Sequence, residues 1–223
     1  MKTKDNTVLI TGGATGIGFA LAEMFVKSGN KVIICGRREK KLEEASTKLP
    51  RLVTRVCDVT SQQGRESLYQ WIEEHYPELN ILINNAGVQR SINLKAGTQA
   101  FITGDSEIDT NLIAPIYLTM QFIPLLLNKD EAAIINVSSG LRSRPSARMP
   151  VYCATKAGLH SFTESLRNQL SDTNIKVFEL VPPRVATSLG REDDAVSGGI
   201  PPSAVAEAAL KALKEDEYEI IVE

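Results

Sequence analysis

A tyrosine and a lysine stand four residues apart in the segment Tyr152-Cys153-Ala154-Thr155-Lys156. On a helix this spacing places the two side chains on one face, so the ammonium lies beside the phenol. A free tyrosine has a pKa of about 10, which is too high for efficient proton exchange at neutral pH, and a neighbouring positive charge lowers that value. The pair therefore indicates acid–base chemistry in which Tyr152 exchanges a proton and Lys156 lowers the pKa of its phenol.

A glycine-rich turn, TGGATGIG at residues 11–18, separates an apolar run from an amphipathic one. Glycine permits a tight strand-to-helix turn and lets the backbone approach a pyrophosphate closely, while the first N–H groups of the helix attract the anion. The spacing Gly-x-x-x-Gly-x-Gly is one residue longer in its first gap than the GxGxxG dinucleotide fingerprint. We expect the turn to bind the phosphates of a dinucleotide through Gly12, Thr15, Gly16, Ile17 and Gly18.

Two arginines, Arg37 and Arg38, follow the expected second strand. In a dinucleotide-binding fold an acidic residue near this point accepts a hydrogen bond from the ribose 2′-hydroxyl of NAD, and this chain has Gly36 there instead. Guanidinium groups suit a 2′-phosphate, through charge-assisted hydrogen bonds. The pattern favours NADP over NAD as the cofactor, the alternative being that both arginines only begin a charged helix.

Short β-branched runs alternate with longer amphipathic stretches along the whole chain. The apolar runs predict strands at residues 7–11, 31–35, 52–57, 80–84, 132–137, 175–181 and 219–222. The amphipathic stretches predict helices at residues 17–27, 39–49, 63–76, 107–127, 150–170 and 202–213. Near-continuous apolar strands separated by helices predict a parallel sheet of about seven strands with helices on both faces, which is a doubly wound α/β (Rossmann) fold.

We expect residues 1–223 to form a single dinucleotide-binding domain, because no linker, repeat or low-complexity tract interrupts this alternation. The most irregular stretch, at about 183–201, has two interpretations. It is either a surface loop or a flexible lid over a site at the carboxyl ends of the strands. Its position in the fold favours the lid.

The bulk composition excludes several classes of protein. The chain is 43% hydrophobic and 23% charged with a formal net charge of −2, which is typical of a soluble globular protein and indicates neither nucleic-acid binding nor a membrane surface. No apolar run reaches the ~18 residues of a membrane-spanning helix, and we find no secretory signal. Three cysteines without CxxC spacing and two histidines argue against a disulfide framework and a metal site. We expect a cytoplasmic, metal-free protein.

Further polar motifs follow the other expected strands. They are Asp58-Val59, Asn84-Asn85-Ala86-Gly87 and Asn136-Val137-Ser138-Ser139. In addition, Asn111 lies on the long central helix, and Ser139 precedes Tyr152 by 13 residues. With the glycine turn and the tyrosine–lysine pair, these motifs resemble the compact short-chain dehydrogenase/reductase family, in order and over essentially the whole chain. Pro182-Pro183, where that family commonly has Pro-Gly, looks like a bacterial subgroup, the DltE-like oxidoreductases.

The resemblance implies roles for these residues. Tyr152 would be the general acid/base, Ser139 would hydrogen-bond the substrate oxygen, and Lys156 would hold the nicotinamide ribose. Asn111 would anchor a water in the proton relay. The remaining cofactor contacts that the resemblance implies are Asp58, Val59, Asn85, Ala86, Gly87, Pro182, Val185 and Thr187.

The expected activity is hydride transfer between a nicotinamide cofactor and a small-molecule carbonyl or alcohol. An alternative is a nucleotide-binding regulator that keeps the fold but turns over weakly, and the presence of all four catalytic-type residues favours the enzyme. An enoyl reductase on the same scaffold would need a wider tyrosine-to-lysine spacing. An epimerase or dehydratase of the extended branch would need a larger substrate domain than this length allows.

The substrate itself stays open at this stage. The candidate pocket residues are mixed in character, and they are Gln89, Arg90, Gly140, Leu141, Arg142, Pro145 and Met149. The arginines at positions 90, 142, 144 and 148 either meet an anionic substrate or are solvated loop charges.

Two expected helices, at 107–127 and 150–170, carry more apolar residues than one buried stripe needs. On the first, the apolar positions are Leu112, Ile113, Ile116, Tyr117, Met120, Ile123, Pro124 and Leu127. Two-fold packing of subunits would bury the surplus, and the resemblance implies the same, because relatives pair these two helices across a dimer axis. We expect a homodimer or homotetramer, the alternative being a monomer in which the stretch 89–104 covers the surplus.

Overall fold

A parallel sheet of seven strands forms the centre of the protein in a computed structural model, which describes residues 1–100, 106–189 and 198–222. The strands are β1 (Thr7–Thr11), β2 (Lys31–Gly36), β3 (Leu52–Val56), β4 (Ile81–Asn84), β5 (Ala132–Val137), β6 (Ile175–Val181) and β7 (Glu219–Ile221). They lie in the order β3-β2-β1-β4-β5-β6-β7. The order reverses direction between β1 and β4, and ligands of such sheets bind at the carboxyl ends of the strands near this reversal.

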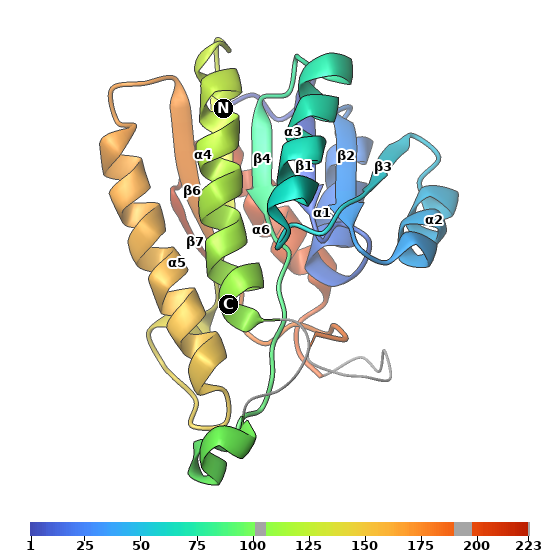
Figure 1. The fold of residues 1–223 in the computed structure, drawn as a ribbon. Coiled ribbons are helices and arrows are strands. Elements are labelled where there is room, and N and C mark those ends of the chain that lie inside the picture. The colour runs from blue at the N-terminus through green and yellow to red at the C-terminus, as the bar shows by residue number, and fades with distance from the viewer. Residues whose placement is uncertain (101–105, 190–197, 223) are drawn as a thin grey trace.

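Helices cover both faces of the sheet (Figure 1). The helices are α1 (Gly16–Lys27), α2 (Glu39–Lys48), α3 (Gln62–His75), α4 (Ala114–Leu127), α5 (Pro150–Gln169) and α6 (Pro202–Glu215). Apolar residues of α1, α2 and α6 share one core cluster with the sheet, and those of α3, α4 and α5 share the other. The strands are buried on both faces, which explains their near-continuous apolar sequences.

The predicted doubly wound fold is confirmed, and most element bounds agree to within one or two residues. Two short 3₁₀ segments of the described chain lie outside the predicted helices, and they are Leu94–Ala100, which is interrupted at Gly97, and Gly140–Arg142. Of the expected lid at 183–201, residues 190–197 lie outside the described part of the chain, as do residues 101–105 of the stretch before the long helix. Both ends of the expected lid are held together, because Val185 pairs with Ile200 in an isolated parallel bridge.

The long central helix contains an unusual segment. Its first residues are helical from Glu107, residues Asp109–Ile113 then form a π-helix, and α4 continues to Leu127. The amide of Ala114 donates to the carbonyl of Asp109, five residues earlier. Segments of π-helix are rare and occur frequently at functional sites.

The stretch Asp109–Leu127 has the length and apolar composition of a membrane-crossing helix, alone among the described helices. However, 44% of it is buried within the protein. Leu118, Phe122 and Leu126 pack into the core cluster beneath α4. These contacts are typical of a central helix in a globular core.

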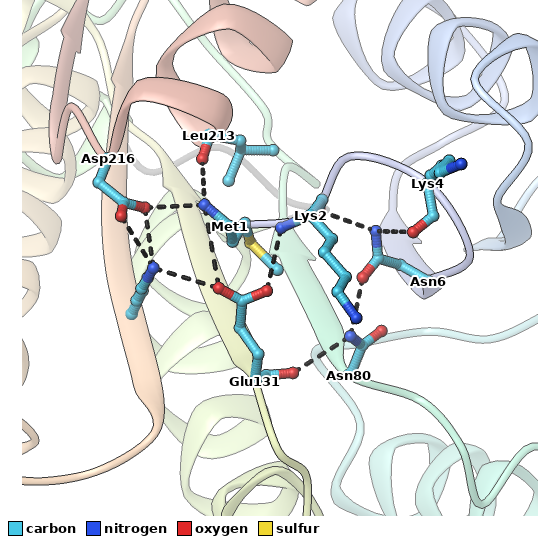
Figure 2. Close-up of polar contacts among 9 residues, drawn as sticks. Met1, Lys2, Lys4, Asn6, Asn80, Glu131, Leu213 and Asp216 are labelled. Atoms are coloured by element: carbon cyan, nitrogen blue, oxygen red, sulfur yellow. Dashed lines mark hydrogen bonds and ion pairs between the residues drawn. The ribbon is translucent and has the colours of Figure 1, made fainter.

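A network of charged groups ties together the amino ends of the strands, at the edge opposite the carboxyl ends (Figure 2). The ammonium of Lys176, at the start of β6, contacts Asp216 at 2.9 Å and Glu131 at 3.2 Å. The amino group of Met1 donates to the Leu213 carbonyl at 2.7 Å and to Asp216 at 2.9 Å. The network joins α6 to β5 and β6 on the side of the sheet away from the candidate site.

Candidate active site

The glycine turn after β1 depends on backbone conformations and close contacts that exclude side chains. Gly12 and Gly16 have φ angles of +64° and +56°, in the left-handed region that favours glycine. A Cβ on Gly12 would lie 2.8 Å from the Ala86 Cα, and one on Gly18 would lie 2.4 Å from the Gly12 carbonyl oxygen. The turn is therefore packed against the segment after β4, and the amino end of α1 faces the carboxyl edge of the sheet.

Hydrogen bonds fix the same two segments to each other. The Asn85 amide Nδ2 donates to the carbonyls of Thr11 and Gly12 at 2.9 and 3.1 Å. The Thr11 hydroxyl oxygen accepts from the backbone N–H groups of Asn85 and Ala86, both at 3.0 Å. Asn85 and Ala86, which the resemblance placed along the cofactor trough, thus also build the turn.

The two arginines after β2 lie beside this turn. Arg37 and Arg38 are exposed, and Nη2 of Arg38 lies 3.3 Å from the Thr15 hydroxyl. The space around Gly36 is open, because a Cβ there would have no heavy atom within 4 Å. After β3, the Asp58 carboxylate accepts from the N–H and hydroxyl of Thr60 at 2.9 and 2.7 Å, which closes a local Asx-turn.

Tyr152, Lys156 and Ser139 come together at the carboxyl ends of the strands. Tyr152 and Lys156 lie near the start of α5, and the Lys156 Nζ is 5.7 Å from the centre of the Tyr152 ring. Ser139 follows β5, and its side chain lies near enough to the Tyr152 phenol to lower the pKa of that phenol. The Ser139 hydroxyl oxygen also accepts from the Leu141 N–H at 3.2 Å, which fixes the turn that carries it.

Burial dominates the ionisation of both groups. Burial raises the pKa of Tyr152 to about 12, and the nearby Ser139 side chain opposes that rise. Burial also lowers the pKa of Lys156 to about 8, because the ammonium is desolvated. Within the described part of the chain, the hydrogen bond that it donates goes to the neutral Val137 carbonyl, at 2.8 Å. Burial therefore sets the direction of the Tyr152 pKa shift in this structure, and the lowering of the phenol pKa by Lys156 stays a prediction.

Asn111 lies inside the π-helical segment and is completely buried. Its side chain accepts from the Val88 N–H and donates to the Val88 carbonyl, both at 2.8 Å, and also donates to the Thr155 hydroxyl at 3.2 Å. A Cβ on Gly87 would lie 3.4 Å from the Asn111 Oδ1 and 4.0 Å from the Lys156 Nζ. The Asn111 amide therefore joins the segment after β4 to α5 beside the lysine.

The segment after β6 closes the site on the other side. The Pro182 carbonyl accepts from the Gly140 N–H at 3.1 Å, and Val185 is buried. The side chain of Thr187 reaches the glycine turn, since a Cβ on Gly16 would lie 3.1 Å from its Cγ2 atom. All predicted contact segments, from residues 12–18 to Thr187, therefore border one region at the carboxyl edge of the sheet.

The structure corrects one of the two interpretations of Arg142. Its side chain is only 8% exposed, so it is not a solvated loop charge. Its guanidinium contacts the carboxylates of Glu179 and Glu219. Arg144 and Arg148, in contrast, have exposed side chains.

Two acidic residues near the site were missed from the sequence. Glu107, at the start of the long helix, is 4% exposed, accepts from the Arg90 N–H at 3.0 Å, and its charge contributes to the raised pKa of Tyr152. Burial raises the pKa of Glu107 itself. Glu179, on β6, is 1% exposed. A usable signal existed for Glu179, because strand alternation places a charged residue at a core-facing position of the run IKVFELV.

The sequence of this chain is similar to those of known oxidoreductases. A family model described as short chain dehydrogenase matches residues 6–196. The chain is 47% identical over 224 residues to the uncharacterized oxidoreductase DltE of Bacillus subtilis, a match that covers 99% of this chain and 89% of that protein.

Solved structures agree. The short chain dehydrogenase/reductase from Burkholderia phymatum in complex with NAD superposes with a TM-score of 0.90 at 21% identity, covering 100% of this chain and 90% of that one, which bears on the fold. The closed form of a serine dehydrogenase complexed with NADP+ superposes with a TM-score of 0.81 at 27% identity, covering 93% and 88%. On the family model and the 47% identical relative, this chain belongs to the short-chain dehydrogenase/reductase family of oxidoreductases, in its DltE-like group.

Proposed function

We propose that this protein is an NADP-dependent carbonyl reductase or alcohol dehydrogenase, acting on a small-molecule carbonyl or alcohol. The observation that carries the proposal is the Lys156 ammonium 5.7 Å from the centre of the buried Tyr152 ring, with Ser139 near enough to lower the pKa of the same phenol. A proton donor, a second hydroxyl for the same substrate oxygen and a positive charge are the groups that reduction of a carbonyl needs.

In the direction of reduction, the Tyr152 phenol gives its proton to the carbonyl oxygen while the carbonyl carbon receives a hydride. The Ser139 hydroxyl donates a hydrogen bond to that oxygen, which orients the carbonyl and stabilises its developing charge. The Lys156 ammonium stabilises the phenolate that remains. A proton from solvent restores the phenol, so each turnover consumes one carbonyl, one hydride and one proton.

The residues present fit a nicotinamide dinucleotide. We propose that the amino end of α1 and its glycine turn hold the pyrophosphate, and that Asp58 and Val59 border the adenine. The open space at Gly36 leaves room for a ribose, and the exposed Arg37 and Arg38 offer positive charge for a 2′-phosphate. When bound, this cofactor supplies or accepts the hydride, and its oxidised ring adds a positive charge that favours the phenolate.

Substitution of Tyr152 by phenylalanine tests the proposal. Tyr152→Phe keeps the ring and removes the proton donor, so turnover of NADPH with a responsive ketone should fall by at least the ~10²-fold typical of losing a general acid. The affinity for NADPH should stay within a few-fold. Tyr218→Phe is the matched control, because that phenol is 39% exposed next to β7, and it should turn over like the unmodified protein.

Two results would count against the proposal. Undiminished turnover by Tyr152→Phe would remove Tyr152 from the chemistry. Tight NADPH binding without turnover of any compound in broad carbonyl and alcohol libraries would favour the nucleotide-binding regulator instead.

A further inference from the structure

Polar residues form a row across four adjacent strands at the carboxyl end of the sheet. The register pairs Asn84 with Asn136, Asn136 with Glu179, and Glu179 with Glu219. On this face of the sheet, the core-facing positions two residues earlier are apolar, and they are Leu82, Ile134 and Val177. Among the four, Glu179 places a carboxylate where only 1% of the residue is exposed.

The Glu179 carboxylate is held from two sides. Its Oε2 accepts from Nη1 of Arg142 at 2.5 Å and lies 2.8 Å from Nδ1 of His160. Its Oε1 is buried and has no hydrogen-bond partner among the described residues. Arg142 also contacts Glu219, which is 47% exposed and so remains in reach of solvent. A buried carboxylate is costly unless it is paired, and apolar residues of similar size would often stabilise the fold better. Packing alone therefore does not explain why a glutamate occupies position 179.

Lys156 is a neighbouring buried charge, and no carboxylate of residues 1–100, 106–189 and 198–222 forms an ion pair with it. It precedes His160 by four residues on α5, so both side chains lie on the same face of that helix. Its Nζ donates to the carbonyl of Val137, and the residue before Val137 is the register partner of Glu179. The lysine and the glutamate thus occupy adjacent positions between α5 and the sheet.

We propose that Glu179 is a positioning residue whose carboxylate, fixed by Arg142 and His160, is the buried counter-charge that keeps Lys156 in its ammonium form. The inference rests on the proposed function, in which Lys156 acts as a positively charged ammonium that stabilises the Tyr152 phenolate. Arg142 has a second consequence for the site, since it ends the 3₁₀ turn that begins after Ser139 and so ties that turn to β6 and β7.

The electrostatic balance around the pair supports this assignment. Of the residues that the structure describes, the charged or titratable side chains around Glu179 are Arg142 from the 3₁₀ turn, Lys156 and His160 from α5, and Glu219 from β7. His160 also faces Glu164, 3.6 Å from its Nε2. Burial lowers the pKa of Lys156 to about 8, and the negative charge of Glu179 opposes that fall. Without this charge the pKa would be lower still, and the ammonium would be lost at a lower pH.

The test compares two glutamates that share one arginine. Glu179→Gln removes the buried charge with little change of shape, and Glu219→Gln makes the same change on the exposed partner. In protein with ¹³C-labelled lysine, the Lys156 Cε signal should titrate about one pH unit lower in Glu179→Gln than in the unmodified protein. In Glu219→Gln it should stay close to the unmodified value. This readout requires no substrate, so it stands even if Tyr152→Phe keeps its turnover and the proposed function fails.

An activity measurement extends the test to the site itself. The alkaline limb of kcat/KM for ketone reduction should move to lower pH in Glu179→Gln, with NADPH affinity near that of the unmodified protein. Equal Lys156 titrations in Glu179→Gln and the unmodified protein would overturn the proposal. The proposal would also be overturned if Glu219→Gln shifted the Lys156 titration as much as Glu179→Gln does. Such a result would mean that the effect depends on Arg142, which both glutamates contact, and not on the Glu179 charge.

A measurement on the unmodified protein covers the case in which Glu179→Gln does not fold. The ¹³Cδ signal of Glu179 should show an inflection at the pH at which Lys156 titrates, and the inflection should vanish in Lys156→Gln. Its absence from the unmodified protein would show that the two charges do not sense each other and would overturn the proposal.

Discussion

At the scale of single residues, Lys156 links the chemistry of the site to the stability of the fold. Burial lowers its pKa from 10.5 to about 8. Between these pH values the unfolded chain binds one proton more at this lysine than the folded protein does. The free energy of unfolding that depends on Lys156 is therefore lowest below pH 8 and rises as the pH climbs toward 10.5.

The predicted rise with pH can be measured by comparison with a variant that has no titrating group at position 156. The free energy of unfolding of the unmodified protein, minus that of Lys156→Gln, should become more positive by about 2 kcal/mol between pH 7 and pH 9.5. Urea unfolding at half-unit pH steps gives both values. Lys214→Gln, at an exposed position on α6, should give a flat difference over the same range. A Lys156 difference that stays constant or falls would contradict the assignment of a lowered pKa.

Cofactor choice is also decided at single residues. The space around Gly36 accepts a side chain, so Gly36→Asp places a carboxylate near the expected ribose without a clash. It should accept from a 2′-hydroxyl and repel a 2′-phosphate, moving the ratio of NADH to NADPH affinity by at least ~10-fold, or about 1.4 kcal/mol. Calorimetric titration of both cofactors measures the ratio, and Gly36→Ala controls for the added Cβ. Tighter binding of NADH than of NADPH by the unmodified protein would refute the preference for NADP.

Sequence motifs identified the residues of the candidate site but not the residues that contact them in the fold. Tyr152, Lys156 and Ser139 could be predicted to meet, because the carboxyl ends of parallel strands share one edge. The contacts of Asn111 with Val88 could not, because they depend on how a loop packs against a helix. The direction of the Tyr152 pKa shift was likewise out of reach, since it depends on how much solvent the folded chain removes.

At the scale of elements, the turn between β1 and α1 depends on the missing Cβ of Gly18. In Gly18→Ala the new atom would lie 2.4 Å from the Gly12 carbonyl oxygen and 2.5 Å from the Asn85 Nδ2, so the backbone would have to shift. We expect a loss of about 1–3 kcal/mol in the free energy of unfolding, together with weaker NADPH binding.

The matched control is Gly198→Ala, where a Cβ would have no heavy atom within 4 Å and the residue is exposed. Thermal melting and NADPH titration of both variants provide the comparison. A Gly18→Ala protein as stable as Gly198→Ala would show that the turn relaxes freely.

The elements themselves were largely predictable, because apolar periodicity sets strands and helices before any tertiary contact forms. The exceptions were local. Nothing in the composition of Asp109–Ile113 marks a π-helix. The 3₁₀ turn Gly140–Arg142 is held by an ion pair to β6 and β7 that no local pattern reveals.

At the scale of the whole molecule, the outer face of α4 favours association. Tyr117, Met120 and Leu127 are 47%, 59% and 44% exposed, so the described part of the stretch 89–104 leaves them uncovered. An α-helix with an uncovered apolar face is typical of a subunit interface in closed oligomers. We therefore propose that the protein forms a homodimer or homotetramer through α4.

Met120→Glu tests this assembly at the most exposed of the three side chains. A carboxylate in the middle of a packed interface costs free energy for its desolvation, so the dissociation constant should rise by at least ~10-fold. Val56→Glu, which changes another apolar residue that is 53% exposed but lies at the end of β3, should leave association unchanged. Sedimentation velocity at micromolar concentration measures both variants beside the unmodified protein. If the unmodified protein sediments near the 24.3 kDa of one chain, and NADPH does not change that, then the protein is a monomer and the apolar face of α4 needs another explanation.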